Sequence, residues 1–298
     1  MIGVGEIGYG YWGPNLVRNV QATPGLRLRY LCDLDVERAR RVLGEYSTVQ
    51  AVSSLDAVLA DPDVAAVAHL RTLVQAGEVG YLQYLHSVRI NLGLVQRDVD
   101  VLWDLAPHDL SIFDSVLPDG VEPIAVSAHG SDPIGAGHAC VAHLTIQLSN
   151  GAMAHVHVNW LSPTKIRTLV VGGSRRTVVW DDLNPSQRLS VYDRGVDTAI
   201  PQQRVRDDSA ARERATVSYR LGDMVAPALP EREALRAVME EFAAAITERR
   251  APLTDGRAGL RVLALLESAT ASMTEGGVFV PVLDALAPAD LLMDGAAS

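Results

Sequence analysis

The hexapeptide GYGYWG at residues 8–13 decides how the N-terminal part of this chain folds. Its glycines are Gly8, Gly10 and Gly13, which have the G-x-G-x-x-G spacing. The motif follows a predicted strand over residues 2–7 and opens a predicted helix over residues 14–22. In this setting the first glycine permits a tight turn, the second lets the backbone approach a pyrophosphate, and the third lets the helix pack on the strand. The pattern predicts a dinucleotide site at a helix N-terminus, with a purely structural turn as the alternative.

An acidic residue follows the glycine turn at the distance that a dinucleotide site requires. Asp33 lies twenty positions after the last glycine, at the end of a second predicted strand over residues 26–33. A carboxylate there can accept hydrogen bonds from both ribose hydroxyls and would repel a 2′-phosphate. The sequence therefore predicts NAD as the cofactor and disfavours NADP. The candidate cofactor-binding residues are Gly8, Gly10, Tyr11, Trp12, Gly13 and Asp33.

Strands and helices alternate tightly at the start of the chain, which predicts a parallel, doubly wound sheet. Helices are expected over residues 34–46 and 53–60, and a strand over residues 64–67, VAAV. That strand runs directly into a predicted helix over residues 69–76. A complete fold of this type needs two βαβαβ halves at about 30 residues per βαβ unit, so about 60 residues are lacking. We therefore expect a truncated Rossmann-like domain over residues 1–68, which keeps the adenosine half of the site.

The pattern changes after residue 77 to a series of long strands with few helices between them. A strand is predicted over residues 81–93, and a helix over residues 101–117 with an irregular turn at Pro107. Further strands are expected over 121–130, 139–149, 152–160, 165–172, 175–181 and 187–193. A polar loop over 202–230 and helices over 231–249 and 255–274 complete the prediction. Such a meander is typical of an antiparallel sheet, so residues 69–298 are expected to form an α+β domain with a large, mostly antiparallel sheet.

Two residues inside the predicted helix over residues 101–117 could carry chemistry. Asp104 and His108 lie four positions apart, which places them on one face of a helix. An imidazole titrates near neutrality, so His108 could pass a proton to or from an alcohol, while Asp104 could orient it or bind a sugar hydroxyl. A solvated or capping pair is the alternative that the spacing alone leaves open.

Five segments together resemble the Gfo/Idh/MocA oxidoreductases, in the order that the family has them. They are IGYGYWGPNLVRN (7–19), CDLD (32–35), VDVLWDLAPHDLSI (99–112), AHVHVNWLSPTKIR (154–167) and TDGRAGLRVLALLESA (254–269). The resemblance implies a Rossmann domain followed by an α/β domain whose open sheet commonly forms a dimer or tetramer interface. It also implies NAD(P)-dependent oxidation or reduction of hydroxyl groups, mostly on sugars, cyclitols and nucleotide-sugars. The family's D-x-x-x-H segment, which supplies substrate-binding and acid/base residues, corresponds to Asp104 and His108.

One family motif is absent from this sequence. The resemblance implies a Glu-Lys-Pro segment whose lysine sits at the nicotinamide, but the only lysine of the chain is Lys165. Lys165 and Arg167 fall in the segment where the family has a basic residue near the substrate, so they are candidate substrate-binding residues. The first hypothesis is an NAD-dependent oxidoreductase that acts on a hydroxyl of a sugar or nucleotide-sugar. The second is a family-derived protein without redox activity, either a binding or partner subunit or a non-redox enzyme. A chain that folds poorly is the third.

Histidines are concentrated in the predicted antiparallel sheet. Five of the eight histidines lie between residues 129 and 157, and His155 and His157 share one face of a strand. A metal site is conceivable there, but acidic or cysteine partners at fitting spacing are missing from the sequence. A polar sheet face or a subunit interface is therefore the preferred interpretation, and no metal is predicted.

Composition restricts the class of partner. The formal net charge of −10 argues against non-specific binding to nucleic acid. No apolar run is long enough to span a bilayer, and the N-terminus lacks a basic region followed by an apolar one, so we expect no membrane partner and a cytoplasmic location. Cys32 and Cys140 lack metal-like spacing and are expected to be core residues. The expected partners are a small sugar or nucleotide-sugar and further copies of this chain, joined through the C-terminal sheet.

Overall fold

The structure is a computed structural model of the 298-residue chain. It describes residues 2–7, 13–32, 50–52, 64–198, 217–229, 234–252 and 254–282. Five of the predicted cofactor-binding residues, Gly8, Gly10, Tyr11, Trp12 and Asp33, lie outside the described residues, as do the helices expected over 34–46 and 53–60. The chain divides into two compact units. The first contains Met1–Ala65 and Pro230–Asp255, and the second contains Ala66–Leu229 and Gly256–Ser298.

The first unit contains a three-stranded parallel sheet in the order β1-β2-β3. Its elements are β1 (Ile2–Ile7), α1 (Gly13–Ala22), β2 (Leu26–Cys32), β3 (Gln50–Val52) and α7 (Ala234–Glu248). The register of β1 against β2 shifts between Val4 and Gly5, where glycine replaces a packing side chain. A small core of Val20, Leu26 and Leu28 packs against Met239 and Ala243 of α7. The sequence prediction assigned this helix to the second domain. The contacts of α7 with α1 and β2 join residues more than 200 positions apart, so they leave no local signal in the sequence.

The strand predicted over residues 64–67 is wrong. These residues form the first turn of α3 (Val64–Gln75). Alanine is the best helix former, and Leu70 and Val74 continue the apolar spacing of Val64 and Val67 at every third or fourth residue. Leu70, Leu73 and Val74 are buried in the core of the second unit. The short apolar run belongs to an amphipathic helix, since such runs are ambiguous between strand and helix until length decides.

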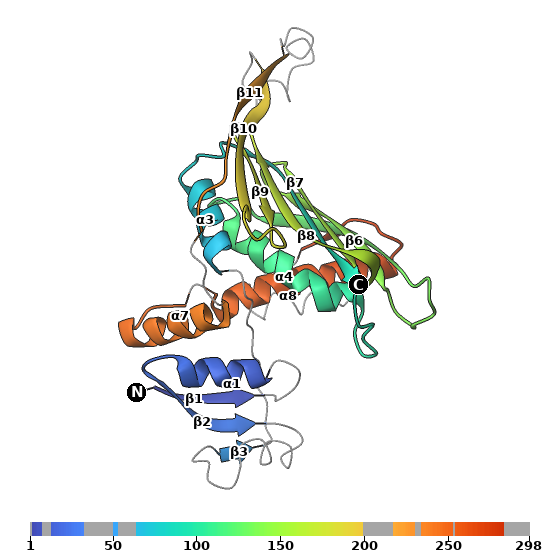
Figure 1. The fold of residues 1–298 in the computed structure, drawn as a ribbon. Coiled ribbons are helices and arrows are strands. Elements are labelled where there is room, and N and C mark those ends of the chain that lie inside the picture. Colours follow the sequence, from blue (N-terminus) through green and yellow to red (C-terminus); the bar gives the residue numbers. More distant parts are fainter. Residues whose placement is uncertain are drawn as a thin grey trace, which may run out of the picture. The chain divides into compact units, whose positions relative to one another are not determined.

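The second unit is built on a nine-stranded sheet in the order β11-β10-β9-β8-β4-β7-β6-β5-β12 (Figure 1). The strands are β4 (Leu82–Leu92), β5 (Pro123–Ser131), β6 (Val141–Leu148), β7 (Met153–Asn159), β8 (Leu161–Gly173), β9 (Thr177–Asp181), β10 (Leu189–Thr198), β11 (Val217–Val225) and β12 (Val280–Pro281). Among the pairs within this sheet, β4 with β7 is parallel and the others are antiparallel. The predicted fold class, a parallel sheet plus a large, mostly antiparallel one, is confirmed.

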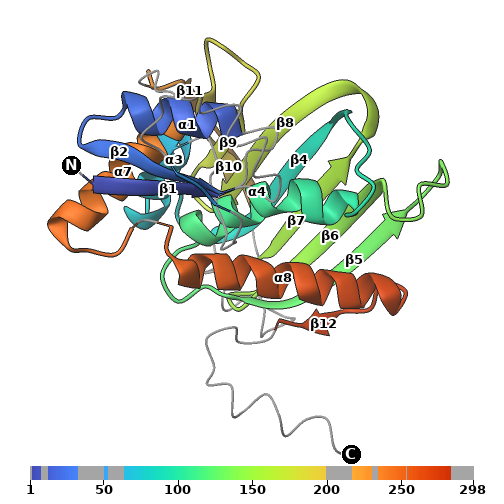
Figure 2. The same ribbon diagram turned by 90° about the horizontal axis from the view of Figure 1, so that it is seen from below.

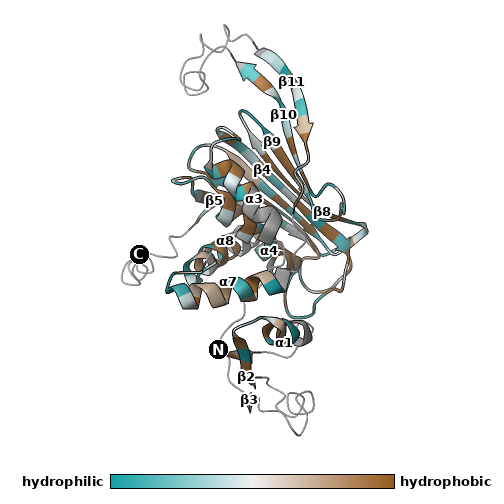
Figure 3. Cartoon of the chain, turned by 60° about the vertical axis from the view of Figure 1, so that its left-hand side comes forward, coloured by the Kyte–Doolittle hydropathy of each residue, from teal (hydrophilic) through white to brown (hydrophobic). Residues whose placement is uncertain are grey.

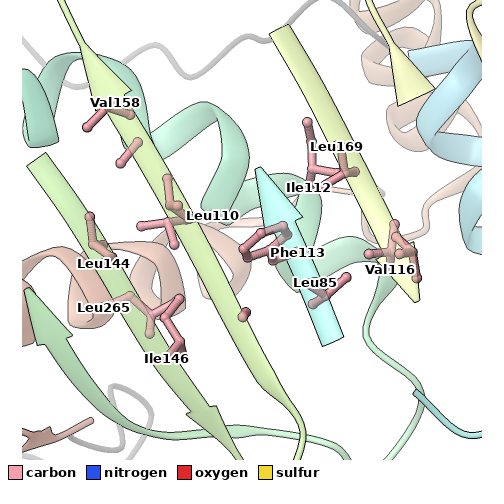
Figure 4. Packing of buried hydrophobic residues seen from close by; sticks show 14 of the residues in the cluster. Leu85, Leu110, Ile112, Phe113, Val116, Leu144, Ile146, Val158, Leu169 and Leu265 are labelled. Atoms are coloured by element: carbon pink, nitrogen blue, oxygen red, sulfur yellow. The ribbon is translucent and has the colours of Figure 1, made fainter. Parts of the chain in front are cut away.

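The helices of the second unit lie on one face of this sheet. They are α3, α4 (Val101–Val116) and α8 (Gly256–Thr274). Helices α4 and α8 run side by side, with α4 over β4, β7 and β6 and α8 over β5 and β12 at the edge of the sheet (Figures 1 and 2). The core between these layers includes Leu85, Leu110, Phe113, Ile146 and Leu265 (Figure 4). The strands alternate between hydrophobic and hydrophilic residues (Figure 3). None of the helices that the structure describes combines the length and apolar character needed to cross a membrane.

Two further predictions in this unit need correction. Helix α4 continues through Pro107, where an irregular turn was expected. Pro107 lacks the N–H that would bond the carbonyl of Trp103, but the neighbouring Ala106 and Leu110 are fully buried and hold the helix on the sheet. Strand β11 lies in the segment predicted as a loop over residues 202–230. Its first five residues, VSYRL, alternate between apolar and polar, but the polar residues around them led to the loop prediction, and β11 is ordered by pairing with β10.

Candidate functional site

Helix α4 brings the candidate acid/base pair to the sheet. Asp100 caps its N-terminus, because the Asp100 carboxylate accepts a hydrogen bond from the Trp103 backbone N–H at 2.9 Å. Trp103 ties the helix to α8, since its indole N–H donates to Thr270 Oγ1 at 2.9 Å. Asp104 and His108 are half-buried, whereas Ala106 and Leu110 face the core. The helix therefore presents Asp104 and His108 one turn apart on a side that is not sealed in the core.

A hydrogen bond fixes the Asp104 carboxylate to the end of a sheet strand. The indole N–H of Trp160 donates to Asp104 Oδ2 at 2.8 Å. Trp160 is 1% exposed and follows the last residue of β7. Its carbonyl accepts a hydrogen bond from Gly93 N just beyond β4, and its N–H donates to the Cys140 carbonyl. The donor is thus held rigidly, which orients Asp104 relative to the strand ends.

His108 lies one helical turn after Asp104. Its backbone carbonyl accepts a hydrogen bond from the Ser111 hydroxyl at 2.8 Å, within the helix. The imidazole is half-buried, so it combines limited exposure with access for a small molecule. A neutral imidazole can accept a proton from an alcohol, and an imidazolium can return one. The geometry of this part of α4 is therefore suited to general acid/base chemistry.

A buried ion pair at Asp109, the residue after His108, anchors α4 to β4. Asp109 receives two hydrogen bonds from Arg89 of β4, one from Nε to Oδ2 at 2.9 Å and one from Nη2 to Oδ1 at 3.2 Å. The Ser87 hydroxyl donates to Asp109 Oδ1 at 2.7 Å. The exposed fractions of the Arg89 and Asp109 side chains are 10% and 3%. This bidentate pair fixes both the rotation and the height of α4 on the sheet, and with them the position of His108.

The predicted substrate-binding residues Lys165 and Arg167 both belong to β8, and Arg167 lies on the face of the sheet that α4 covers. Arg167 of β8 pairs in register with Arg89, whose side chain contacts α4, so both point to the helix-covered face. Lys165 stands two residues before Arg167 and is exposed, in the stretch where β8 bulges away from β4 between the pairs Ile90–Ile166 and Leu92–Leu161, so regular strand alternation ends before it. Arg167 Nη1 lies 3.4 Å from Asp182 Oδ2. The structure thus places Arg167 on the side of the sheet that carries Asp104 and His108, with Lys165 close to it along the same strand.

Sequence reasoning did not single out Trp160, Arg89, Ser87 or Asp109. Arg89 offered a signal, because it shares the inward alternation of Leu85 and Ser87 along β4. A charged residue on a buried strand face requires a buried partner. The identity of that partner depends on how α4 crosses β4, which only the structure provides. Asp109 stands next to His108, but the resemblance drew attention to the D-x-x-x-H spacing alone.

The first unit has the βαβ arrangement that a dinucleotide site needs. Strand β1 leads to α1, which begins at Gly13, and β2 then runs parallel to β1. Asp33 follows directly after Cys32, the last residue of β2. This arrangement fits the adenosine half of NAD, with the turn at residues 8–12 and Asp33 as the residues that would hold it. The roles of those residues stay predictions, since the turn and Asp33 lie outside the described ranges.

A mainly apolar pocket lies elsewhere in the second unit. It has a volume of about 420 Å³ and lies between the sheet and the helices, at the Leu85 end of β4. Phe113, Ile146 and Leu265 line it, and the ion pair between Arg261 and Asp114 borders it. Trp160 and Asp104 do not line this pocket. In the described ranges, no group of three or more His, Cys, Asp or Glu side chains is placed to hold a metal ion.

Comparison with known proteins places these features in a family. The family model described as "Oxidoreductase family, C-terminal alpha/beta domain" (GFO_IDH_MocA_C) matches residues 98–282, which include α4, β7 and β8. A UDP-N-acetylglucosamine 3-dehydrogenase from Acidithiobacillus ferrooxidans is 31% identical over 235 residues. That match covers 78% of this chain and 65% of the relative, so the chain spans less than two thirds of that protein's length.

Solved structures of similar proteins share the fold. The structure of UDP-N-acetylglucosamine 3-dehydrogenase GnnA from A. ferrooxidans superposes with a TM-score of 0.65 at 23% identity, covering 92% of this chain and 99% of that one. The WlbA dehydrogenase from Bordetella pertussis, in complex with NADH and UDP-GlcNAcA, gives a TM-score of 0.67 at 16% identity over 95% and 98% of the two chains. An oxidoreductase domain protein from Kribbella flavida gives 0.70 at 14% identity, over 95% and 99%. Since the family model covers more than half of its residues, the chain belongs to the Gfo/Idh/MocA family of oxidoreductases.

Proposed function

We propose that this protein is an NAD-dependent oxidoreductase that acts on a hydroxyl group of a sugar or nucleotide-sugar. The observation that carries the proposal is the pair formed by Asp104 and His108 on α4, with Asp104 held by the buried indole of Trp160. Relatives that are dehydrogenases of UDP-N-acetylglucosamine and of related sugars support the substrate class. The sugar hydroxyl and the pyrophosphate of such a substrate call for an acid/base group and for cations, and α4 and β8 supply both.

In the oxidative direction, the substrate hydroxyl loses its proton to a ring nitrogen of His108 while a hydride leaves the carbinol carbon. The carbon–oxygen bond becomes a carbonyl, and the imidazolium returns its proton to solvent or, in the reverse direction, to the carbonyl oxygen. Asp104 would accept a hydrogen bond from a neighbouring sugar hydroxyl or stabilise the imidazolium. Lys165 and Arg167 would bind the oxygens of the substrate, bidentately at Arg167 if these belong to a phosphate.

The cofactor expected from the first unit is NAD, which when bound accepts or supplies the hydride. The glycine turn would contact its pyrophosphate through backbone N–H groups at the start of α1. Asp33 would accept hydrogen bonds from the adenosine ribose and would disfavour a 2′-phosphate, so NADP is expected to bind more weakly.

A direct assay can test the proposed reaction. The full chain is incubated with NAD⁺ and UDP-N-acetylglucosamine, then with related nucleotide-sugars and free sugars, while the appearance of NADH is followed by absorbance. We expect substrate-dependent formation of NADH with at least one nucleotide-sugar. Absence of NADH with the whole panel, for a chain that binds NADH in calorimetry, would restrict the proposal to another substrate class.

A second candidate is a protein of this family that binds ligands without redox chemistry. The observation that favours it is the absence of a Glu-Lys-Pro segment together with the position of the single lysine, Lys165, in β8. In this case the adenosine half of the cofactor site would be retained and the nicotinamide half would not. Equal affinity for NADH and ADP-ribose, with no change in nicotinamide absorbance, would favour this candidate.

We further propose that copies of this chain associate through the helix-free face of the large sheet. On β4, β6 and β7 this face presents Tyr84, His86, Val88 and Ile90, then His143, Thr145 and Gln147, and then Met153, His155, His157 and Asn159. None of these residues is Lys, Arg, Asp or Glu, whereas a solvated sheet face is normally rich in charge. Six strands about 4.8 Å apart, each with seven residues at about 3.3 Å, outline about 670 Å² in projection. This area is close to the roughly 800 Å² that each partner buries in a stable interface.

A further inference from the structure

Five histidines form a cluster on the helix-free face of the large sheet. The histidine cluster consists of His86 on β4, His129 on β5, His143 on β6, and His155 and His157 on β7. His86 pairs in register with His155, and His143 pairs with both His129 and His157. Residues opposite one another in neighbouring strands point to the same face, so all five imidazoles share one surface. Four of the five lie between residues 129 and 157 of the sequence, and strand order brings His86 to them and places all five on one face.

The imidazoles are in contact with one another and with uncharged groups. The rings of His143 and His157 stack with centroids 4.1 Å apart and an interplanar angle of 15°. Thr145 Oγ1 lies 3.2 Å from His155 Nδ1. The turn after α8 approaches the outer edge of the cluster, where Gly277 leaves room for the His129 ring. The imidazoles of the cluster are therefore close enough for neutral rings to stack. Two adjacent imidazolium rings would repel each other.

Few charged or titratable groups face the cluster from the surrounding strands. On β4 the neighbour is Tyr84, and on β8 the facing residues are Thr168 and Val170, which do not titrate. On β9, Asp181 pairs with Thr168 at the margin of the face. On β10, Tyr192 pairs with Thr177 of β9 and lies farther out. Apart from Asp181, the described strands thus provide no anion on this face to compensate protonated histidines.

Protonation of two members is already disfavoured in the single chain. Burial lowers the pKa of His86 below its ordinary value of 6.5, and the charge of His155 lowers it further. Burial also lowers the pKa of His157, with additional contributions from His143 and His86. The neutral forms therefore predominate at neutral pH, which keeps the centre of the face uncharged. Covering the face with a second protein surface would remove more water and strengthen the same preference.

We propose that the histidine cluster makes association of two copies of this chain sensitive to acid, with the neutral cluster permitting the interface and its protonation separating the copies. This inference rests on the proposed association through the helix-free face. In a two-fold symmetric interface the same face meets itself, so both clusters are buried together. Protonation then places like charges within one desolvated layer that lacks counter-charges. If association lowers the pKa of one histidine per copy by one further unit, the dimer weakens as the pH falls through these pKa values, with a limit of about 100-fold well below both of them.

Sedimentation of the full-length chain at several concentrations tests this inference. Wild-type protein is compared at about pH 7.5 and about pH 5.5, on either side of the ordinary imidazole pKa. The test variant combines His86→Gln, His155→Gln and His157→Gln, which keeps polar side chains but removes the titration. The single variant His157→Gln serves if the triple variant folds poorly. His138→Gln is the matched control, because His138 packs edge-on against Trp160, away from the cluster.

The expected result is a wild-type dimer at the higher pH whose dissociation constant rises about 10- to 30-fold at the lower pH, which is not far below the pKa values of the histidines. His138→Gln should behave as wild type, the triple variant should change less than about threefold, and His157→Gln should fall between them. A dimer that is equally tight at both pH values overturns the inference but leaves the association intact. A triple variant that follows wild type also overturns it. A wild-type monomer at the higher pH overturns the association, and the inference with it.

Discussion

The indole N–H of Trp160 donates to Asp104 Oδ2 at 2.8 Å, which links the first turn of α4 to the end of β7. Trp160 is 1% exposed and its own backbone is held by Gly93 and Cys140. The donor therefore cannot follow Asp104 if the carboxylate rotates. This relationship turns a pair of residues at helical spacing into a group with a defined orientation, which is what a substrate-binding acid/base site requires.

Replacing Trp160 by phenylalanine should lower stability through the loss of this hydrogen bond. A hydrogen bond to a charged group contributes about 1.5–3 kcal/mol, so Trp160→Phe should lower the free energy of unfolding by about that amount. Trp103→Phe is the matched control, because the Trp103 indole donates to the neutral Thr270 hydroxyl and should cost about 0.5–1.5 kcal/mol. Urea denaturation measures both values. Equal losses, or a larger loss for Trp103→Phe, would contradict the role given to the bond with Asp104.

The buried pair of Arg89 and Asp109 should be far more sensitive to disruption than an exposed pair on the same helix. Asp109→Asn leaves the Arg89 guanidinium buried without its carboxylate, which should cost about 3–5 kcal/mol. Asp114→Asn breaks the pair with Arg261, whose side chain is 45% exposed, and should cost at most about 1 kcal/mol. Unfolding can be followed by fluorescence, since Trp103, Trp160 and Trp180 all belong to the second unit.

A double variant separates the cost of an unpaired charge from the value of the pair itself. Replacing Arg89 by methionine together with Asp109 by leucine removes both charges and keeps most of the volume. We expect this double variant to be more stable than Asp109→Asn, because no buried charge is left without a partner. If the double variant is less stable than the single one, the pair contributes net stabilisation beyond avoiding an unpaired Arg89.

Removal of the proposed acid/base group should affect turnover more than binding. If the chain oxidises a nucleotide-sugar, His108→Asn should lower kcat about 100- to 10,000-fold with a smaller change in KM. Asp104→Asn should raise KM as well, since Asp104 is expected to contact the substrate. Asp114→Asn, on the same helix but bordering the distant pocket, should leave both constants unchanged. A His108→Asn variant with wild-type kcat would exclude His108 as the acid/base group.

The lowered pKa values of His86 and His157 predict how stability depends on pH. In the folded state both histidines bind a proton less readily than in the unfolded chain, whose imidazoles titrate near 6.5. As the pH falls, the unfolded state therefore binds more protons than the folded state. The two histidines leave the free energy of unfolding unaffected above about pH 7, and they lower it as the pH drops from 6.5 toward their pKa values in the folded state. The melting temperature should decrease between about pH 7.5 and pH 5.5, and it should decrease less in the variant His86→Gln/His157→Gln. Parallel curves for the two proteins would refute this explanation.

The sequence predicted the strands whose burial alternates and failed where order comes from contacts distant along the chain. In strand β7 (Met153–Asn159) buried residues alternate strictly with exposed or partly buried ones, and its predicted range of 152–160 is confirmed within one residue at each end. Strand β11 was missed although its first five residues, VSYRL, alternate, because the short signal lies within a segment rich in Arg and Asp. Its pairing with β10 and the ion pairs of Arg220 with Asp193 and Asp197 hold it.

The candidate site shows the same division. Asp104 and His108 could be proposed from their spacing and from the family resemblance, and the roles of Lys165 and Arg167 remain predictions. The support beneath them could not be foreseen, because Trp160 reaches Asp104 across 56 residues of sequence and Arg89 reaches Asp109 across 20. Those contacts depend on how α4 crosses β4 and β7. Neither helical periodicity nor strand alternation encodes that crossing.

The specificity for NAD can be tested at Asp33 without knowledge of the substrate. If Asp33 accepts hydrogen bonds from the adenosine ribose, Asp33→Ala should weaken NADH binding about tenfold or more and reduce the preference for NADH over NADPH. Calorimetric titration of the wild-type protein and of Asp33→Ala with NADH and NADPH gives the ratio of the two dissociation constants for each protein. An unchanged preference would assign the discrimination to other residues.

The most direct test of an NAD-dependent oxidoreductase is calorimetric titration of the full-length chain with NADH and, separately, with ADP-ribose. The two ligands share the adenosine diphosphate and differ in the nicotinamide. The proposed function predicts that NADH binds at least about tenfold more tightly, because the nicotinamide adds contacts of its own. Equal affinities, or binding of ADP-ribose alone, would contradict it and would indicate that this member of the family has kept the adenosine site without the redox reaction.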